Sequence, residues 1–209
     1  MSTILRTWSY QYQWLYDSIS RLAALSVGGE KRFRTIAWQG LDINRNTKVL
    51  DLCCGAGQST QFLVQQSDYV TGLDISPVAL ARATKNVPKA NYIEALAQEI
   101  PLPETQFDLV HTSAALHEMT PTQREEIMRE VFRVLKPGGV FILVDFHRPT
   151  NWLFWPGLTL FMWLFETQTA WQMLATDLVS QLEKNGFQTI NQTLYAGGTL
   201  QVIQARKNE

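Results

Sequence analysis

The stretch VLDLCCGAGQST, residues 49–60, decides the fold, because an apolar segment runs directly into a Gly-x-Gly turn. Its first four residues predict a short buried strand. Gly55 and Gly57 predict the turn through which the chain enters a helix. A residue without Cβ can adopt positive φ there and lets a ligand approach the backbone N–H groups closely.

A second apolar segment, residues 69–73, is followed directly by Asp74. A strand, a glycine turn, a helix and a second strand tipped with an acid form a unit that binds a nucleoside, in which the acid takes the ribose hydroxyls. A nicotinamide dinucleotide fits less well, because Thr60 stands where a third glycine is expected and Asp51 would repel a pyrophosphate. The charges favour a ligand that is cationic at its centre and carries a ribose at one end.

The chain has 209 residues, enough for one α/β domain with a full core. Its net charge of −1 gives no general attraction to nucleic acid, so we expect no nucleic-acid partner. Cys53 and Cys54 are adjacent, which suits neither a disulfide framework nor a zinc site and favours a reducing compartment. The sequence has no secretory signal and no apolar run long enough to span a membrane, so we expect a cytoplasmic protein.

Strand and helix patterns alternate along the chain, which predicts helices on both faces of a sheet. Two helix starts are well marked: Ser76 precedes a proline, and Thr120 precedes a proline and a capping-box Gln123. The predicted fold class is α/β, a doubly wound, mostly parallel seven-stranded sheet with an antiparallel strand from a C-terminal hairpin. The expected strands are 47–52, 69–73, 91–95, 107–111, 140–146, 187–194 and 200–205, and the expected helices are 8–26, 30–39, one from 58, one from 77, 120–135 and 176–185.

We expect a single domain over residues 1–209 with four parts. A helical cap (1–46) precedes a cofactor-binding core (47–146). An aromatic lid (147–175) follows, and then a C-terminal helix and hairpin (176–209). In an open parallel sheet, ligands bind beyond the carboxyl ends of the strands, so the segments that follow the core strands should meet at one site.

Three segments resemble, in order and spacing, the motifs of class I S-adenosylmethionine-dependent methyltransferases: VLDLCCGAG with Asp74, FDLVHTSAALHEM (107–119) and EVFRVLKPGGVFILVDF (130–146). The resemblance implies a Rossmann-like fold and S-adenosylmethionine as the cofactor. It also implies that Asp74 holds both ribose hydroxyls, that Asp51 and Gly55 lie near the methionine part, and that the segments after the third and fourth strands border the rest of the ligand. The implied cofactor-binding residues are Asp51, Cys53, Gly55, Gly57, Asp74, Ile75, Ala97, Gln98 and Ser113.

Two positions depart from the family pattern. Cys53 stands where a glycine is usual, which is tolerated if that position does not need positive φ. Leu96 stands where an acid often meets the adenine amino group, which would cost a hydrogen bond unless Glu94 or Glu99 substitutes.

An aromatic insert, WLFWPGLTLFMWLF (152–165), follows the fifth strand on the expected substrate side. No single helix face could bury all its aromatic side chains, so a lipophilic substrate, a membrane surface or a second subunit is expected there, with a packed lid as the alternative. Outside the core, Tyr16-Asp17, GEKRFR (29–34) and Gly197-Gly198 are similar to the ubiquinone/menaquinone-biosynthesis C-methyltransferases. We therefore predict C-methylation of a prenylated quinol and peripheral membrane contact through Trp152–Phe165. A homodimer is compatible with this surface.

Methyl transfer of this kind needs no metal, and the sequence indicates none. Much of the barrier is lowered by holding the nucleophile, methyl carbon and sulfur in line. Ring-carbon methylation also requires the loss of a phenolic proton, for which a nearby base helps. The predicted catalytic residues follow the fourth and fifth strands: His117, Glu118, His147 and Arg148. His111 lies inside a strand and is expected to be structural.

Two further functions stay open on the sequence. An O- or N-methyltransferase of a soluble metabolite would pack its lid internally. A non-catalytic S-adenosylmethionine-binding scaffold would use the aromatic insert to hold a partner. Methylation of nucleobase amino groups is disfavoured, because Ser113-Ala114-Ala115-Leu116 stands where an Asn/Asp-Pro-Pro-aromatic motif is expected.

Overall fold

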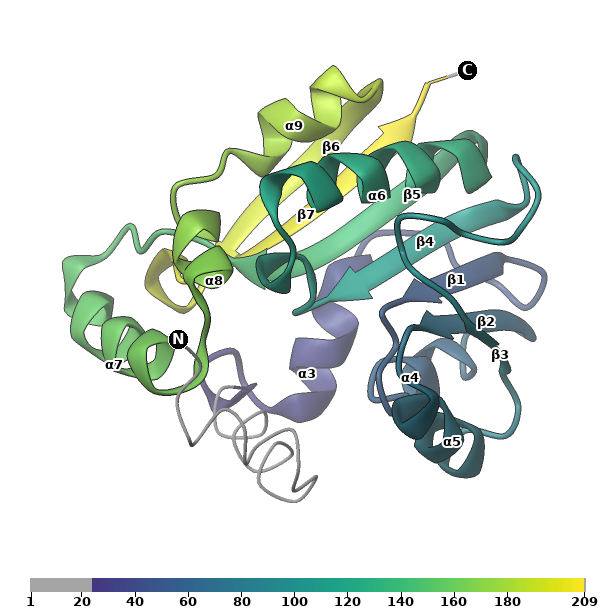
Figure 1. Ribbon diagram of the computed structural model, residues 1–209, viewed down its shortest axis with the longest axis horizontal. Helices are drawn as coiled ribbons and strands as arrows, with labels where there is room; N and C mark the ends of the chain where they lie inside the picture. The colour runs from purple at the N-terminus through teal and green to yellow at the C-terminus, as the bar shows by residue number, and fades with distance from the viewer. Residues whose placement is uncertain (1–23, 209) are drawn as a thin grey trace.

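The computed structural model describes residues 24–208 and contains a seven-stranded sheet flanked by helices (Figure 1). The strand order is β3-β2-β1-β4-β5-β7-β6. β1 to β5 pair in parallel, whereas β7 runs antiparallel to both of its neighbours, β5 and β6. The predicted fold class is confirmed. The strands are β1 (Lys48–Leu52), β2 (Tyr69–Asp74), β3 (Asn91–Glu94), β4 (Phe107–Ser113), β5 (Leu135–Phe146), β6 (Phe187–Tyr195) and β7 (Leu200–Lys207).

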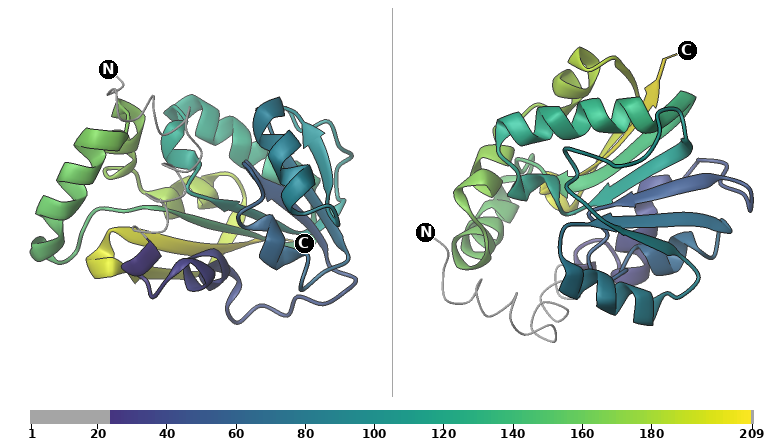
Figure 2. Two further views of the ribbon diagram at one scale, coloured as in Figure 1. Left: turned by 90° about the horizontal axis from the view of Figure 1, so that it is seen from below. Right: turned by 45° about the vertical axis from the view of Figure 1, so that its right-hand side comes forward.

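Helices cover both faces of the sheet (Figures 1 and 2). Alternate residues of the central strands point to opposite faces: Phe141 and Leu143 of β5 pack with α6 and α9, whereas Ile142 packs with η1 and α4. Burial on both faces explains why these strands are continuous apolar runs in the sequence. The α-helices and 3₁₀ helices (η) are α3 (Glu30–Thr35), η1 (Ile36–Trp38), α4 (Thr60–Leu63), α5 (Pro77–Asn86), η2 (Leu116–Glu118), α6 (Pro121–Val134), η3 (Trp152–Phe154), α7 (Trp155–Phe165), α8 (Gln168–Met173), α9 (Leu178–Lys184) and η4 (Ala196–Gly198).

Both marked helix starts are confirmed. The Ser76 hydroxyl accepts a hydrogen bond from the backbone N–H of Ala79 at 3.2 Å and begins α5. At the start of α6, Thr120 Oγ1 accepts from the backbone N–H of Gln123 at 3.3 Å, and Gln123 Oε1 accepts from the backbone N–H of Thr120 at 2.9 Å. This reciprocal pair satisfies two N–H groups that the first helical turn leaves without partners.

The main differences from the prediction concern three elements, and α8 was not expected from the sequence. The helix expected from residue 58 is α4, which begins at Thr60 after the turn formed by Gly55 and Gly57, both of positive φ. β5 starts at Leu135 instead of 140, because the chain already pairs with β4 at Leu135. The pairing then continues through a register irregularity. The helix expected over 30–39 divides into α3 and η1. The helix expected over 8–26 lies almost wholly outside the described residues.

The aromatic insert forms η3 and α7, and α7 stands out beyond the end of the sheet at the left of Figure 1. Only Leu158 and Met162 of α7 are buried. Within residues 24–208, no helix is both long enough and apolar enough to cross a membrane.

Candidate active site

The turn after β1 and Asp74, the last residue of β2, are joined directly. Asp74 Oδ2 accepts a hydrogen bond from the backbone N–H of Gly55 at 2.9 Å, and Oδ1 accepts from the backbone N–H of Ser76 at 2.9 Å. Gly55 has φ of 55°, and a Cβ there would lie 3.3 Å from Gln58 Oε1. The carboxylate therefore orders both the glycine turn and the start of α5.

A cavity of about 780 Å³ lies at the carboxyl ends of the first four strands. Its size is typical of sites for small molecules. Several side chains at the cavity were not predicted from the sequence, among them Arg82 of α5 and Met119 after η2. The sequence did contain a signal for Arg82: it lies one turn into the helix that begins just after Asp74, and this places it near the cavity. The predicted residues that line the cavity are Cys53, Gly55, Asp74, Ile75, Ala97, Gln98 and Glu118.

Three predicted cofactor-binding residues do not line this cavity. Asp51 is buried beneath the turn, where it accepts hydrogen bonds from Thr60 Oγ1 at 2.6 Å and from His111 Nδ1 at 2.7 Å. Gly57 packs against the end of α5. The Ser113 hydroxyl is buried and has no hydrogen-bond partner within residues 24–208. These residues support the cavity from below, and the cofactor-binding role of the predicted set stays a prediction.

The position of Cys53 does require a left-handed backbone, since its φ is 57°. The condition under which a cysteine would be tolerated without strain there is therefore not met. Burial, followed by the charges of Asp74 and Asp51, raises the pKa of the Cys53 thiol to about 12. A thiol that stays protonated at neutral pH is a poor nucleophile.

The second departure, Leu96, lies at the cavity and is 42% exposed. Neither Glu94 nor Glu99, the acids that could have substituted for the usual carboxylate, lines the cavity. Gln98 does line it, so its side-chain amide is the polar group that this segment offers there.

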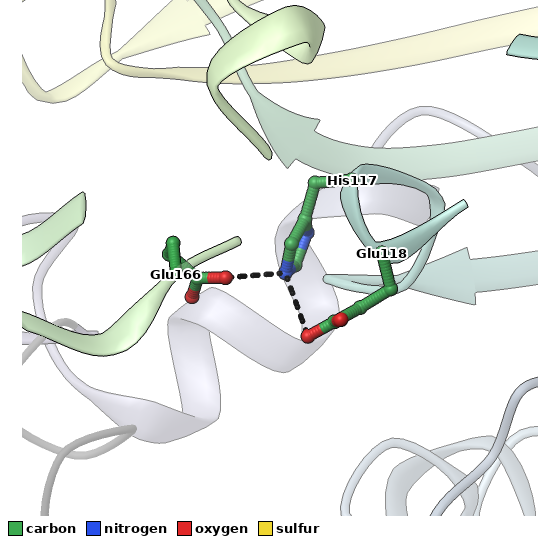
Figure 3. Close-up of side chains that lie close together, drawn as sticks. All are labelled: His117, Glu118 and Glu166. Atoms are coloured by element: carbon green, nitrogen blue, oxygen red, sulfur yellow. Dashed lines mark ion pairs between the residues drawn. The ribbon is translucent and has the colours of Figure 1, made fainter. Parts of the chain in front are cut away.

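His117 lies at the centre of a second cluster of polar side chains, beside the cavity (Figure 3). Its Nδ1 donates a hydrogen bond to Asp145 Oδ1 at 2.7 Å. Its Nε2 lies 3.7 Å from Glu118 Oε1 and 3.5 Å from Glu166 Oε2. The carboxylates come from three segments: η2, the end of β5, and the turn after α7. Glu166 was not predicted, because no local pattern brings the residue after an aromatic helix to the end of β4.

Burial by itself would lower the pKa of His117. The charge of Asp145, its hydrogen bond and the charges of Glu166 and Glu118 outweigh that effect and raise the pKa to about 9. The raised pKa favours the protonated ring, whose Nε2 faces the carboxylates of Glu118 and Glu166 as an ion pair. This differs from the expectation that a histidine here serves as a base.

The other predicted catalytic pair, His147 and Arg148, lies elsewhere. Both line a separate hollow of about 430 Å³ that also includes Asp177. The backbone N–H of His147 donates to Thr199 O at 2.9 Å, which turns the chain after β5 toward the hairpin between β6 and β7. The structure thus brings Glu118 to the wall of the main cavity, with the buried His117 next to it, and keeps His147 and Arg148 apart in the other hollow.

The main cavity fits a nucleoside with a cationic centre. The carboxylate of Asp74 is an acceptor suited to two hydroxyls, and Glu118 supplies a second negative charge at the cavity wall. The glycine turn leaves room for close approach to the backbone. S-adenosylmethionine matches this combination, with a ribose at one end and a sulfonium between its two halves.

Comparison with known proteins identifies the family. The sequence profile of a family described as a methyltransferase domain matches residues 49–139. An uncharacterised methyltransferase of Synechocystis sp. is 60% identical over 209 residues, which cover 100% of this chain and 99% of that protein. The chain belongs to the class I S-adenosylmethionine-dependent methyltransferases, and S-adenosylmethionine is its cofactor.

Two further comparisons describe its place in this class. A ubiquinone/menaquinone biosynthesis C-methyltransferase of Proteus mirabilis is 30% identical over 143 residues, which cover 64% of this chain and 55% of that protein. The crystal structure of an S-adenosylmethionine-dependent methyltransferase of Mesorhizobium loti superposes with a TM-score of 0.63 at 22% identity, covering 85% of this chain and 96% of that one. The first is a likeness to quinone-modifying enzymes, and the second shows the shared fold.

Proposed function

We propose that the protein transfers the methyl group of S-adenosylmethionine to a ring carbon of a lipophilic aromatic acceptor, a prenylated quinol. The observation that carries this proposal is an apolar aromatic path that leads from the exposed surface of α7 to His117. The distant likeness to quinone C-methyltransferases supports the same acceptor class.

The path consists of aromatic rings in successive contact. The distances between ring centroids are 4.6 Å from His117 to Phe146, 6.0 Å from Phe146 to Phe161 and 5.4 Å from Phe161 to Phe165. Aromatic rings favour offset or edge-to-face contacts at these distances. A planar apolar acceptor would find the same kind of contact along this row.

The outer end of the path is an exposed apolar surface. Trp152, Leu160 and Trp163 are 75%, 57% and 67% exposed. Residues 149–165 contain no charged side chain. An uncharged surface rich in tryptophan suits the boundary between the apolar interior of a bilayer and water. We propose that this surface contacts the membrane from which the acceptor is taken.

S-adenosylmethionine supplies a methyl group made electrophilic by the neighbouring sulfonium. In this proposal the glycine turn and Asp74 hold the cofactor in the cavity, and the acceptor reaches it along the aromatic path, which ends at His117 beside the cavity residue Glu118. This arrangement lowers the barrier by fixing the reacting groups in line. Of the predicted catalytic residues, His117 and Glu118 lie where the acceptor would arrive, and their role in catalysis stays a prediction.

A transfer assay tests the acceptor class. The protein is incubated with methyl-labelled S-adenosylmethionine and either a total lipid extract or a soluble-metabolite extract. We expect label in a prenylated quinol fraction. Label only in the soluble fraction would replace the proposal with an O- or N-methyltransferase of a soluble metabolite, and cofactor binding without any transfer would favour the scaffold.

The membrane contact is tested with paired variants. Trp152→Ser together with Trp163→Ser should weaken sedimentation with lipid vesicles and slow transfer to the lipid acceptor, while leaving cofactor binding unchanged. Tyr69→Ser is the matched control, because Tyr69 is 55% exposed at the start of β2. Equal vesicle binding by all three proteins would contradict the proposed contact.

A further inference from the structure

We propose that His117, Glu118 and Glu166 form a binding site for a divalent transition-metal ion beside the cofactor cavity. The sequence predicted no metal, since the two glutamates are 48 residues apart and no metal-binding motif joins them. The proposal rests on the geometry of this cluster and does not depend on the identity of the methyl acceptor.

The donor atoms converge at a spacing that suits a metal ion. One atom from each of the three residues can be chosen so that all lie within 4.8 Å of one another. His117 Nε2 is 3.5 Å from Glu166 and 3.7 Å from Glu118. Two ligands held about 2.1 Å from a tetrahedral ion are about 3.4 Å apart, so a small inward movement of the carboxylates completes the arrangement.

Asp145 fixes the orientation of His117 in a way that suits metal binding. It accepts hydrogen bonds from His117 Nδ1 at 2.7 Å and from the backbone N–H of His117 at 3.2 Å, which fixes both the ring and its main chain. With Nδ1–H committed to Asp145, the remaining nitrogen, Nε2, faces Glu118 and Glu166 (Figure 3). A carboxylate on the far nitrogen of a histidine is the usual support of a metal-binding imidazole.

Burial strengthens the argument for a cation. The side chains of His117 and Glu166 are only 5% and 10% exposed, and that of Glu118 is 25% exposed. Among residues 24–208, the three carboxylates of Asp145, Glu118 and Glu166 surround this one imidazole. The nearby guanidinium of Arg124 donates hydrogen bonds to Met119 O and to Thr176 Oγ1, and its charge also acts on Asp145. A divalent ion would replace the Nε2 proton, which leaves to solvent, and would take the two glutamates as charged ligands.

The donor set indicates the class of ion. One imidazole nitrogen and two carboxylate oxygens suit borderline ions such as Zn²⁺, Mn²⁺ or Co²⁺ better than Ca²⁺ or Cu⁺. Because Glu118 also lines the main cavity, the ion would border the space in which cofactor and acceptor meet.

Titration calorimetry with Zn²⁺ on chelator-treated protein tests the site. We expect one ion per chain, and we expect Glu166→Gln and Glu118→Gln each to weaken binding at least about tenfold, because each removes a charged ligand. Glu125→Gln, an exposed residue on α6, is the matched control and should bind like the wild type. Equal affinity for all four proteins, or no binding by the wild type at millimolar Zn²⁺, would overturn the proposal.

A second readout covers the case in which a variant fails to fold. Co²⁺ added to the wild-type protein should give the intense visible absorption of a low-coordinate ion, and Zn²⁺ should displace it. Absence of that absorption would also overturn the proposal. Both measurements are made without any methyl acceptor, so failure of the metal site is distinguishable from failure of the proposed acceptor.

Discussion

Asp74 connects the glycine turn to the start of α5 and is the residue on which cofactor binding is expected to depend most. Asp74→Ala removes an ionised acceptor and also leaves the backbone N–H groups of Gly55 and Ser76 without this partner. We expect the affinity for S-adenosylmethionine to fall by about 1.5–3 kcal/mol, since hydrogen bonds to charged groups contribute that much. Calorimetry measures the loss, and unchanged affinity would mean that the ribose lies elsewhere.

The backbone of Cys53 has a positive φ, a conformation that glycine adopts more easily than a residue with a side chain. The left-handed region costs an L-residue roughly 1–2 kcal/mol of conformational free energy because of its Cβ. Cys53→Gly should therefore be more stable than Cys53→Ala by about 1 kcal/mol, even though both lose the thiol. Chemical denaturation of the two variants measures the difference. An alanine variant as stable as the glycine variant would show that φ at this position relaxes without cost.

Both cysteines should be unreactive in the folded protein. The pKa of Cys53 is raised to about 12, and burial with the charges of Asp51 and Asp74 raises that of Cys54 as well. A shift from 9.0 to about 12 leaves roughly a thousandfold less thiolate at pH 8 for Cys53. We expect slow reaction with a disulfide reagent in the native state and fast reaction of both thiols in denaturant. Fast native reaction at pH 8 would contradict this environment.

Among the helices, α6 has a start that the sequence specifies completely. Thr120→Ala removes the hydroxyl that caps the backbone N–H of Gln123 and breaks the reciprocal pair. We expect a loss of about 1 kcal/mol in the free energy of unfolding, the typical value for an N-cap. Thr122→Ala, exposed one residue into the helix, is the control and should change stability little. Equal losses would mean that the cap contributes nothing specific.

The sequence predicts elements best where the determinants are local. The caps at Ser76 and Thr120 and the apolar runs of β1, β2 and β4 depend on neighbouring residues, and they are found close to where they were expected. Boundaries were less accurate where tertiary pairing decides, as at the start of β5, which pairs with β4 across an irregularity.

The residues of the candidate site divide in the same way, into those placed by local sequence and topology and those placed by tertiary packing. Residues at or shortly after the carboxyl end of a strand, such as Gly55, Asp74 and Glu118, could be placed from topology alone, because parallel strands end at one edge of the sheet. Glu166 could not, since its position depends on how α7 packs. His147 was misplaced because the backbone after β5 bonds to Thr199 and leaves the cavity.

At the scale of the whole molecule, Gln204 joins segments that are far apart in the sequence. Its buried side-chain amide donates to Ala37 O at 2.8 Å and to Gln39 O at 3.0 Å, linking β7 to the end of η1. Gln204→Ala would leave these buried carbonyl groups without that donor, so we expect a loss of about 1–3 kcal/mol in the free energy of unfolding. Urea denaturation measures it. Gln188→Ala, exposed on β6, is the control, and matching losses would mean that the link is not stabilising.

The order of the last two strands has a consequence for synthesis. β6 is made before β7, yet it reaches the sheet only through β7, which lies between it and β5. While the chain is being translated, β5 therefore keeps an open edge until β7 emerges, and β6 must wait without a partner. Open strand edges invite pairing with other chains. A form of the chain in which β7 has not yet paired with β5 is therefore the one that we expect to pair most readily with other chains.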